Sequence, residues 1–521
     1  MQSLDLSVPL QLTIALGPDL LLMVGAMILL LWAAWRPDSA AHQRRVATAS
    51  IVLTVLTGAA VWWYLLRGYT AAPGPIAIDN FRWMADLVIL TGTVFAIALA
   101  RDDNDRQGIG VAESHVLILL ASSGMMLLAA ARDLMIVFLA VELMSIAAYA
   151  LAGLNRRSVR SAEGALKYFL LGAFSSAFLL YGIALVYGAT GTTNLAFIAE
   201  RMVAGSEGAT ALMLGGSAGT AALMLAGIAF LLVGFGFKVA TVPFHMWAPD
   251  VYDGAPSAIT AYMAATVKAA AFAAFLRVWL EAFPAAYGAW HAALVALAVA
   301  TMIVGNVVGL AQRNLKRLLA YSSIGHAGYL LVAVAPASLQ GASAMLFYLF
   351  IYTLATFGAF AVIIAMTRPG RQTVMVDELS GLWAVRPWLA VGMTVLMLAL
   401  LGFPVFGGGG FFAKWYVLQA ALQSPNPQVG LAVALVLTTV VSAGYYLYVI
   451  MVIFMRAPSA DAEPLPPTPA LTRVVLATAV VGILVLGVYP NWLHRVAAKG
   501  LPRVEDASIV HIGNAPIRRS R

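Results

Sequence analysis

Five ionisable side chains stand inside apolar segments of this 521-residue chain: Glu142, Lys238, Lys268, His326 and Lys414. A charge in hydrocarbon is costly, so such residues mark functional sites by default. Buried carboxyl, amine and imidazole groups can gain or lose a proton, whereas an arginine stays charged. Only six of the 31 basic residues are lysines, three of them in this set, and most arginines lie between apolar segments. The distribution indicates a membrane protein that moves protons.

The spacing along the chain predicts how deep these residues lie. Glu142 follows Asp133 by nine residues, which is roughly 13 Å along a helix. Lys268 follows Ser257 by eleven residues and is about half a membrane deep by the same measure. Lys238 precedes Pro243 by five residues, and the helix break there frees carbonyl groups that could hold its ammonium or a water.

Each candidate also has a structural interpretation. Glu142 could be a protonated glutamate that only locks helices together, and Lys238 could snorkel to an interface. His326 could be a satisfied packing histidine rather than a proton relay. We interpret Glu142 and Lys238 as counter-ions, and Lys414 as the counterpart of Lys238 in the other half of the chain.

Other charged residues are weaker candidates. Glu163 and Lys167 are spaced as an interfacial i, i+4 ion pair, and Lys316 belongs to a basic connection. Asp19 and Asp86 lie near predicted helix ends. The remaining group follows the seventh apolar segment and could cap it or admit protons: His245, Asp250 and Asp253.

Composition bounds the class of protein that must position these residues. The chain is 62% hydrophobic and 10% charged, with a mean hydropathy of +0.89, which predicts an all-α polytopic membrane protein. Its net charge of +8 is spread over many connections, which does not indicate nucleic-acid binding. The absence of cysteine excludes disulfides, thiolate-bound iron–sulfur clusters and cysteine-ligated zinc. We expect no cofactor or metal in this chain.

We predict about fourteen transmembrane helices, with boundaries good to a few residues. They lie near 12–35, 46–66, 80–100, 113–131, 133–153, 161–188, 221–248, 257–282, 289–311, 316–335, 341–366, 386–422, 429–455 and 470–489. Pro243 interrupts the seventh span, and Pro404 with the run Gly407 to Gly410 interrupts the twelfth. Two broken helices five apart predict inverted five-helix repeats, the usual surroundings of a transport site at the membrane midplane.

Charges in the connections predict the orientation. Arginines concentrate after odd-numbered spans, as at Arg44, Arg101 and Arg156, which places those connections in the cytoplasm and both termini outside. The basic tail after residue 490 opposes this arrangement.

Three stretches carry a resemblance to a known family. Phe237–Ser257 reads FKVATVPFHMWAPDVYDGAPS, Asn314–His326 reads NLKRLLAYSSIGH, and Ala165–Ala173 reads ALKYFLLGA. These stretches resemble the antiporter-like membrane subunits of respiratory complex I, the proton-translocating NADH:quinone oxidoreductase, and the similarity covers roughly residues 10 to 490. Lys414 stands where the M branch of that family usually has glutamate, and we expect no lateral helix like that of the L branch after the fourteenth span. It is therefore most similar to the N branch.

The resemblance implies a division of the chain and a role for each part. Residues 1–110 would form helices 1–3, residues 111–284 and 285–456 the two five-helix repeats, and residues 457–521 helix 14 with a basic tail. Glu142, Lys238, Lys268 and Lys414 would form the proton-conducting line, with His326 as a relay.

The resemblance also implies where the redox chemistry happens. NADH, flavin, iron–sulfur clusters and quinone would bind to other subunits, so that this chain contributes proton translocation to a translocase without a redox site of its own. Its neighbours would be subunits M, K and J in a bacterial inner membrane.

Two alternatives to a proton-translocating complex I subunit remain at this point. One is a cation/proton antiporter subunit of the same fold that exchanges sodium for protons. The other is a structural membrane spacer that conducts nothing, although unpaired buried lysines are a costly way to build one.

Overall fold

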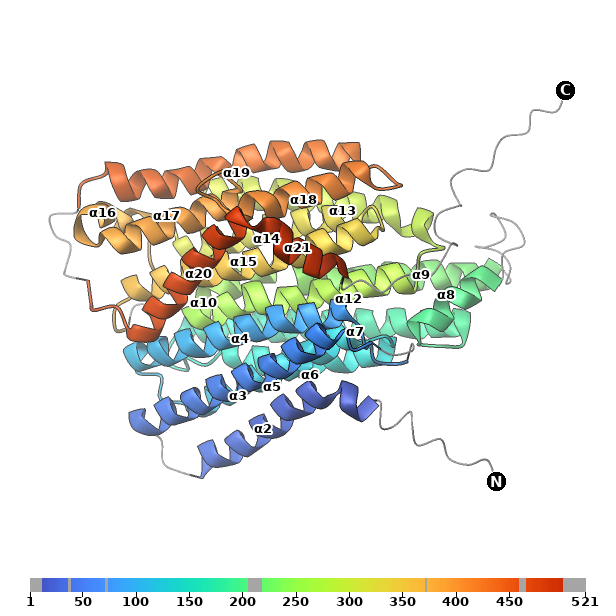
Figure 1. Ribbon diagram of the computed structural model, residues 1–521, viewed down its shortest axis with the longest axis horizontal. Coiled ribbons are helices and arrows are strands. Elements are labelled where there is room, and N and C mark those ends of the chain that lie inside the picture. The colour runs from blue at the N-terminus through green and yellow to red at the C-terminus, as the bar shows by residue number, and fades with distance from the viewer. Residues whose placement is uncertain are drawn as a thin grey trace.

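The computed structural model describes residues 12–35, 39–70, 74–204, 218–370, 373–458 and 465–499. Its helices lie side by side along one common direction, with α2 and α3 at one edge and α19 at the opposite edge (Figure 1). Within the described residues there is no β-strand, only three isolated bridges between connections. The expected all-α membrane fold is confirmed.

The first half of the chain contains α2 to α12. The elements are α2 Gly17–Ala34, α3 Ala40–Arg67, α4 Asn80–Gln107, α5 Glu113–Ala130, α6 Leu134–Ala152, α7 Val159–Thr190, α8 Leu195–Ala204, α9 Ala218–Val239, α10 Trp247–Gly254, α11 Ser257–Tyr262, the π-helical turn η1 Met263–Val267, and α12 Lys268–Glu281.

The second half contains α13 to α21. The elements are α13 Tyr287–Leu310, α14 Leu315–Val334, α15 Leu339–Met366, the 3₁₀ turn η2 Val376–Leu379, α16 Leu382–Val385, α17 Pro387–Leu401, α18 Gly409–Gln423, α19 Val429–Met455, α20 Ala470–Val488 and α21 Pro490–Lys499.

Twelve of the described helical segments are long and apolar enough to cross a membrane, and the shorter apolar helix α17 adds to them. Each of the fourteen predicted spans corresponds to a helix or to a broken pair of helices. The short helices α8, α16 and α21 were not predicted. Residues 1–11 and 500–521, on which the expectations for the termini and most of the tail depend, lie outside the described residues.

Helix ends follow local sequence signals. Ser39, Asp79 and Asp133 cap the N-termini of α3, α4 and α6 by accepting a hydrogen bond from a backbone N–H of the first turn. Gly68 and Gly108 end α3 and α4 in the left-handed conformation, which favours glycine. The Asp133 cap fixes where α6 begins and therefore how deep Glu142 lies.

Both predicted helix breaks are present. The seventh span stops at Val239, and residues 240–246, including Pro243, separate α9 from α10. The twelfth span stops at Leu401, and Gly402 adopts a φ of 78° before α18 begins at Gly409.

Burial is graded across the molecule. The span Ser257–Glu281 is 100% buried over its apolar window and α15 is 94% buried, whereas α2 and α3 are 28% and 22% buried. The eighth span and α15 therefore lie at the centre, and the α2–α3 hairpin lies at the periphery, at one edge of Figure 1.

Candidate functional site

The five candidate residues come from five different spans around the molecular centre. Glu142 lies in α6, Lys238 near the end of α9, Lys268 at the start of α12, His326 in α14 and Lys414 in α18. The three lysines and His326 are each at least 93% buried, and Glu142 is half-buried. None of the three ammonium groups makes an ion pair within the described part of the chain.

Lys238 contacts hydroxyl groups on α6. Its Nζ donates to Ser145 Oγ at 2.8 Å and lies 3.5 Å from Tyr149 Oη. Glu142, Ser145 and Tyr149 are spaced i, i+3, i+7 and share one face of the helix. The expected counter-ions thus lie on neighbouring helices, but Glu142 and Lys238 are not in direct contact, and Glu142 Oε1 is buried without a hydrogen bond.

The break after α9 does not supply Lys238 with carbonyl oxygens. Gly236 O accepts from the Thr241 N–H at 2.8 Å, and Phe237 O accepts from Trp247 Nε1 at 3.1 Å. The turn residues and Trp247 therefore satisfy these two carbonyls, and the Lys238 ammonium bonds to α6 instead.

Lys268 follows the π-helical turn η1 directly. π-helical turns are rare and often occur at functional sites. The ammonium donates to Ser323 O at 2.6 Å and also to Ser323 Oγ, both on α14. Lys268 is thereby hydrogen-bonded to α14, three residues before His326 on that helix.

His326 bridges two tyrosines. Its Nδ1 is 2.6 Å from Tyr348 Oη on α15, and its Nε2 is 3.1 Å from Tyr446 Oη on α19. The Tyr446 hydroxyl also bonds Ser322, the neighbour of Ser323. A neutral imidazole donates from one nitrogen and accepts at the other, and hydroxyl groups can do either. The arrangement can therefore pass a proton by an exchange of tautomers.

Lys414 uses a carbonyl of the second helix break, a kind of contact that was predicted for Lys238. Its Nζ donates to Leu401 O, at the end of α17, at 2.9 Å and to Thr439 Oγ1 at 3.2 Å. The ammonium also lies 4.4 Å from the centre of the Tyr329 ring. A cavity of ≈ 10 Å³ lies against both His326 and Lys414, close to the space that one water molecule needs.

These contacts form two groups. Direct hydrogen bonds link α12, α14, α15 and α19 around Lys268 and His326, and the small cavity connects His326 with Lys414. Across the described residues, no hydrogen bond joins Lys238 to Lys268.

A second set of buried charges was not predicted. Arg82, fully buried in α4, forms ion pairs with Asp19 on α2 and with Asp86 one turn on. The two aspartates lie near helix ends, as expected, but Arg82 was not among the candidate residues. The i, i+4 spacing of Arg82 and Asp86 was the signal available in the sequence.

A neighbouring buried pair joins α12 to the start of α4. Arg277 donates to both carboxylate oxygens of Asp79, at 2.8 and 3.0 Å. Burial alone would raise the pKa of Asp79, but the Arg277 guanidinium outweighs it and holds the pKa below the ordinary value.

Lys316 is the second correction. It was expected to be a topology or partner contact in a basic connection, yet it is fully buried. Its ammonium donates to Asp253 O at 3.0 Å and Ala255 O at 2.6 Å, where it satisfies carbonyls at the C-terminal end of α10. The buried Asp103 of α4 interacts with it electrostatically.

The expected pair Glu163–Lys167 is confirmed at 2.7 Å. Lys167 also reaches Asp250 at 2.8 Å, and Arg317 reaches the same carboxylate at 2.8 Å. Asp253 accepts from Asn314 at 2.6 Å. Asp250 and Asp253 therefore fasten α10 to α7 and α14, while His245 lies in the break between α9 and α10.

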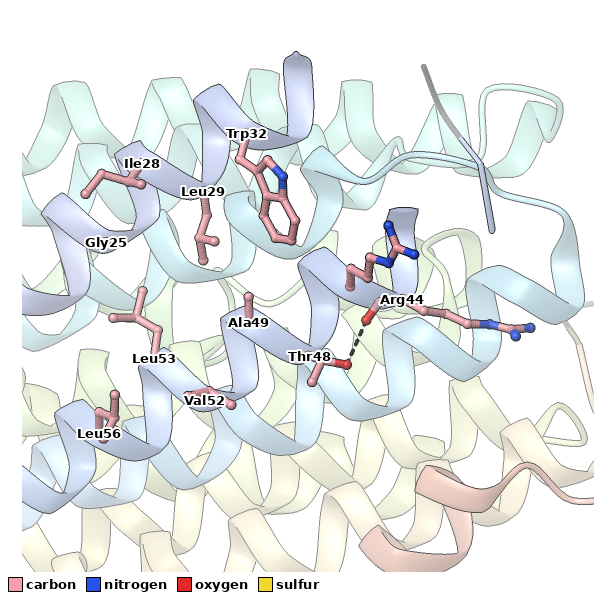
Figure 2. Close-up of a pocket in the computed structure, with 11 residues that line it drawn as sticks. Gly25, Ile28, Leu29, Trp32, Arg44, Thr48, Ala49, Val52, Leu53 and Leu56 are labelled. Carbon is pink, nitrogen blue, oxygen red and sulfur yellow. Dashed lines mark hydrogen bonds between the residues drawn. The ribbon is translucent and has the colours of Figure 1, made fainter. Parts of the chain in front are cut away.

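A cavity of ≈ 700 Å³ lies apart from the five candidate residues, between α2 and α3 (Figure 2). Its lining holds no carboxylate and no histidine. No cluster of three or more metal-binding side chains occurs among the residues that the structure describes. The chemistry that the sequence predicts therefore belongs to the buried lysines rather than to this cavity.

Comparison with known proteins places the chain. The family described as "NADH:quinone oxidoreductase/Mrp antiporter, TM" matches residues 131–442. NADH-quinone oxidoreductase subunit N of Gemmatimonas aurantiaca is 51% identical over 503 residues, covering 95% of this chain and 94% of that protein. The chain belongs to the subunit N family of NADH-quinone oxidoreductases.

A second curated relative agrees with this assignment, and two solved structures contain a chain of similar fold. The subunit N of Methylobacterium nodulans is 40% identical over 489 residues, covering 93% of this chain and 97% of that protein. A chain in the structure of respiratory complex I from Thermus thermophilus with bound aureothin matches with a TM-score of 0.77 and 36% identity, over 93% of this chain and 100% of that one. A chain of the Mrp complex from Dietzia sp. DQ12-45-1b shares the fold, with a TM-score of 0.79 at 21% identity over 94% of this chain and 97% of that one.

Proposed function

We propose that this subunit translocates protons across the membrane through Glu142, Lys238, Lys268, His326 and Lys414. One observation carries the proposal: three buried lysines are held by hydroxyl and carbonyl oxygens and not by carboxylates. A lysine that only stabilised the fold would be expected to have a buried counter-ion. A hydroxyl group can accept a hydrogen bond from an ammonium and donate one to a neutral amine, so that both protonation states are accommodated.

The two halves of the proposed pathway correspond to inverted five-helix repeats, residues 111–284 and 285–456. Residues 1–110 form the N-terminal helices, and residues 457–521 form helix 14 and the tail. The equivalent positions of the α9–α10 and α17–α18 breaks support this division, because each break lies beside one of the lysines.

The energy for translocation comes from quinone reduction in other subunits. The relatives are named as subunits of NADH-quinone oxidoreductase, which supports an assembly in which NADH, flavin, iron–sulfur clusters and quinone bind elsewhere. In this proposal subunits M, K and J are the neighbours, the membrane is the bacterial inner membrane, and both termini face the periplasm. This chain is then the proton-translocating part of a translocase.

The test uses Lys238→Ala and Glu142→Ala in the assembled complex, with quinone reduction and proton uptake into vesicles measured together. Loss of proton pumping is expected in both variants. Lys167→Ala is the matched control, because that lysine is 41% exposed and paired with carboxylates. Undiminished pumping with near-normal quinone reduction in both variants would refute the assigned roles.

A second experiment addresses the alternative of a sodium/proton antiporter. The likeness to the Mrp chain concerns the fold alone at 21% identity. Purified chain in liposomes is expected to show no exchange of sodium for protons. Sodium-dependent exchange by the chain alone would favour the antiporter instead.

A further inference from the structure

The α2–α3 hairpin contains a long open groove. Both helices qualify as membrane spans, and they are the least buried of all the described spans. The groove is lined by Ile28, Leu29 and Trp32 of α2 and by the α3 face around Val52 (Figure 2). The side chains of Ile28 and Val52 are 61% and 52% exposed. An apolar surface of this kind inside a membrane faces lipid unless a protein covers it.

The groove has the length of one membrane leaflet. Its lining on α3 extends from Arg44 to Leu56, a rise of twelve residue steps or roughly 18 Å, and one leaflet of hydrocarbon is about 15 Å thick. At the deep end α2 and α3 approach closely, because a Cβ on Gly25 would lie 2.5 Å from Leu53 Cδ2. The groove is thus open along one leaflet and narrow at the midplane.

The shallow end of the groove is positively charged. Arg44 and Arg45 line it, and the Arg44 side chain is 55% exposed. Arg44 pairs through Nε with Asp105 at 2.9 Å. Arg45 is exposed, with no ion pair or hydrogen bond to another side chain within the described residues. Two arginines facing one carboxylate leave a net positive charge at the depth of the lipid headgroups.

We propose that this groove binds an anionic phospholipid, with one acyl chain along α3 and the phosphate at Arg44 and Arg45. Basic pockets between transmembrane helices are suited to such headgroups. An apolar transmembrane helix from another subunit fits less well, because it would leave the positive charge at Arg44 and Arg45 without an anionic partner. The lipid belongs to the leaflet on the side of the α2–α3 connection.

The test uses the whole purified complex and phosphatidylglycerol that carries a photoreactive group on one acyl chain. We expect crosslinks to peptides of α2 and α3, with unlabelled phosphatidylglycerol competing and phosphatidylcholine not competing. Arg45→Gln breaks no ion pair and should reduce labelling about fivefold, and Arg44→Gln with Arg45→Gln about 25-fold.

Two variants keep the result interpretable. Arg67→Gln is the matched control, because this exposed arginine lies at the opposite end of the same helix, and labelling should not change. Ala49→Phe fills the groove without altering its charge, and we expect this variant to abolish labelling. Labelling that is absent in the wild type, unaffected by the arginine and Ala49 variants, or replaced by crosslinks from α2–α3 to another subunit would overturn the proposal.

Discussion

The ammonium groups of the three buried lysines differ in the partners that hold them. Lys238 relies on hydroxyls of α6, Lys268 on one serine of α14, and Lys414 on a carbonyl freed by a helix break. Each partner set can be changed without removing the lysine. The contribution of the surroundings to proton transfer can therefore be measured separately from that of the amine.

Ser145→Ala removes the closer hydroxyl partner of Lys238 and leaves Tyr149 at 3.5 Å. A hydrogen bond to a charged group contributes about 1.5–3 kcal/mol, so we expect the pumping rate to change about tenfold or more while the complex assembles. Ser123→Ala is the control, because this buried serine bonds only its own helix, at Leu119 O. Equal pumping rates in the two variants would contradict a role for Ser145.

Arg82→Met leaves Asp19 and Asp86 buried without their cation. Breaking a buried pair in this way costs about 3–5 kcal/mol, so we expect a lower melting temperature of the complex or failed assembly. Replacing Asp86 with leucine in the same chain should restore part of the loss. A melting temperature unchanged by Arg82→Met would contradict the structural role of this cluster.

At the scale of single residues, the sequence predicted the ionisable groups but only some of their partners. Ser145 and Tyr149 share a helix face with Glu142, so their spacing in the sequence was enough to predict that the three side chains lie together. Ser323 is 55 residues from Lys268 and Tyr446 is 120 residues from His326. Such contacts depend on how spans pack, which no local pattern encodes. The ion pair between Asp19 and Arg82, which are 63 residues apart, was missed for the same reason.

At the scale of elements, the second helix break depends on glycine. A Cβ on Gly410 would lie 2.0 Å from Ala399 O, so the start of α18 passes close to the end of α17 only because no side chain intervenes. This contact explains why glycine stands at position 410, shortly before Lys414. It also brings the lysine to Leu401 O.

Gly410→Ala should therefore push α18 away from α17 and lengthen the contact between Lys414 and Leu401. We expect reduced pumping and a lower melting temperature, measured in the assembled complex. Gly430→Ala in α19 is the control, because nothing lies within 4 Å of the added Cβ. Indistinguishable behaviour of the two variants would show that the close approach is unimportant.

The short helix α10 is fastened by the Asp250 carboxylate. Burial raises the pKa of Asp250, but hydrogen bonds from Lys167 and Arg317 outweigh it, so that the pKa lies below the ordinary value of 3.8. A carboxyl group whose pKa is lowered by folding stabilises the fold at pH values above its ordinary pKa. This contribution to stability is lost as the pH falls through the pKa of the folded state.

Asp250→Asn should therefore lower the melting temperature modestly at pH 7, since partly exposed pairs contribute about 1 kcal/mol or less. The difference from the wild type should stay constant between about pH 8 and 5 and shrink only at more acidic pH. Thermal melts over that pH range check this. A difference that already disappears at pH 6 would contradict the lowered pKa.

At the scale of the whole molecule, hydropathy and helix breaks were sufficient to predict the fourteen spans. The fourteen apolar segments and the two prolines can be recognised in the sequence without any knowledge of how the helices pack. The short helix α8 and the peripheral position of the α2–α3 hairpin depend on tertiary packing and were not predicted. The same packing places Lys268 in the most buried span and brings it into contact with α14 of the second half.

The central claim is that protons cross the membrane through these buried lysines. The most direct measurement is the number of protons pumped per NADH oxidised by complexes that carry Lys268→Met, reconstituted in sealed vesicles. Methionine preserves the volume and the apolar contacts while removing the proton site. The account predicts a lower ratio than in the wild type, even where residual NADH oxidation persists. An unchanged ratio at normal turnover would contradict it.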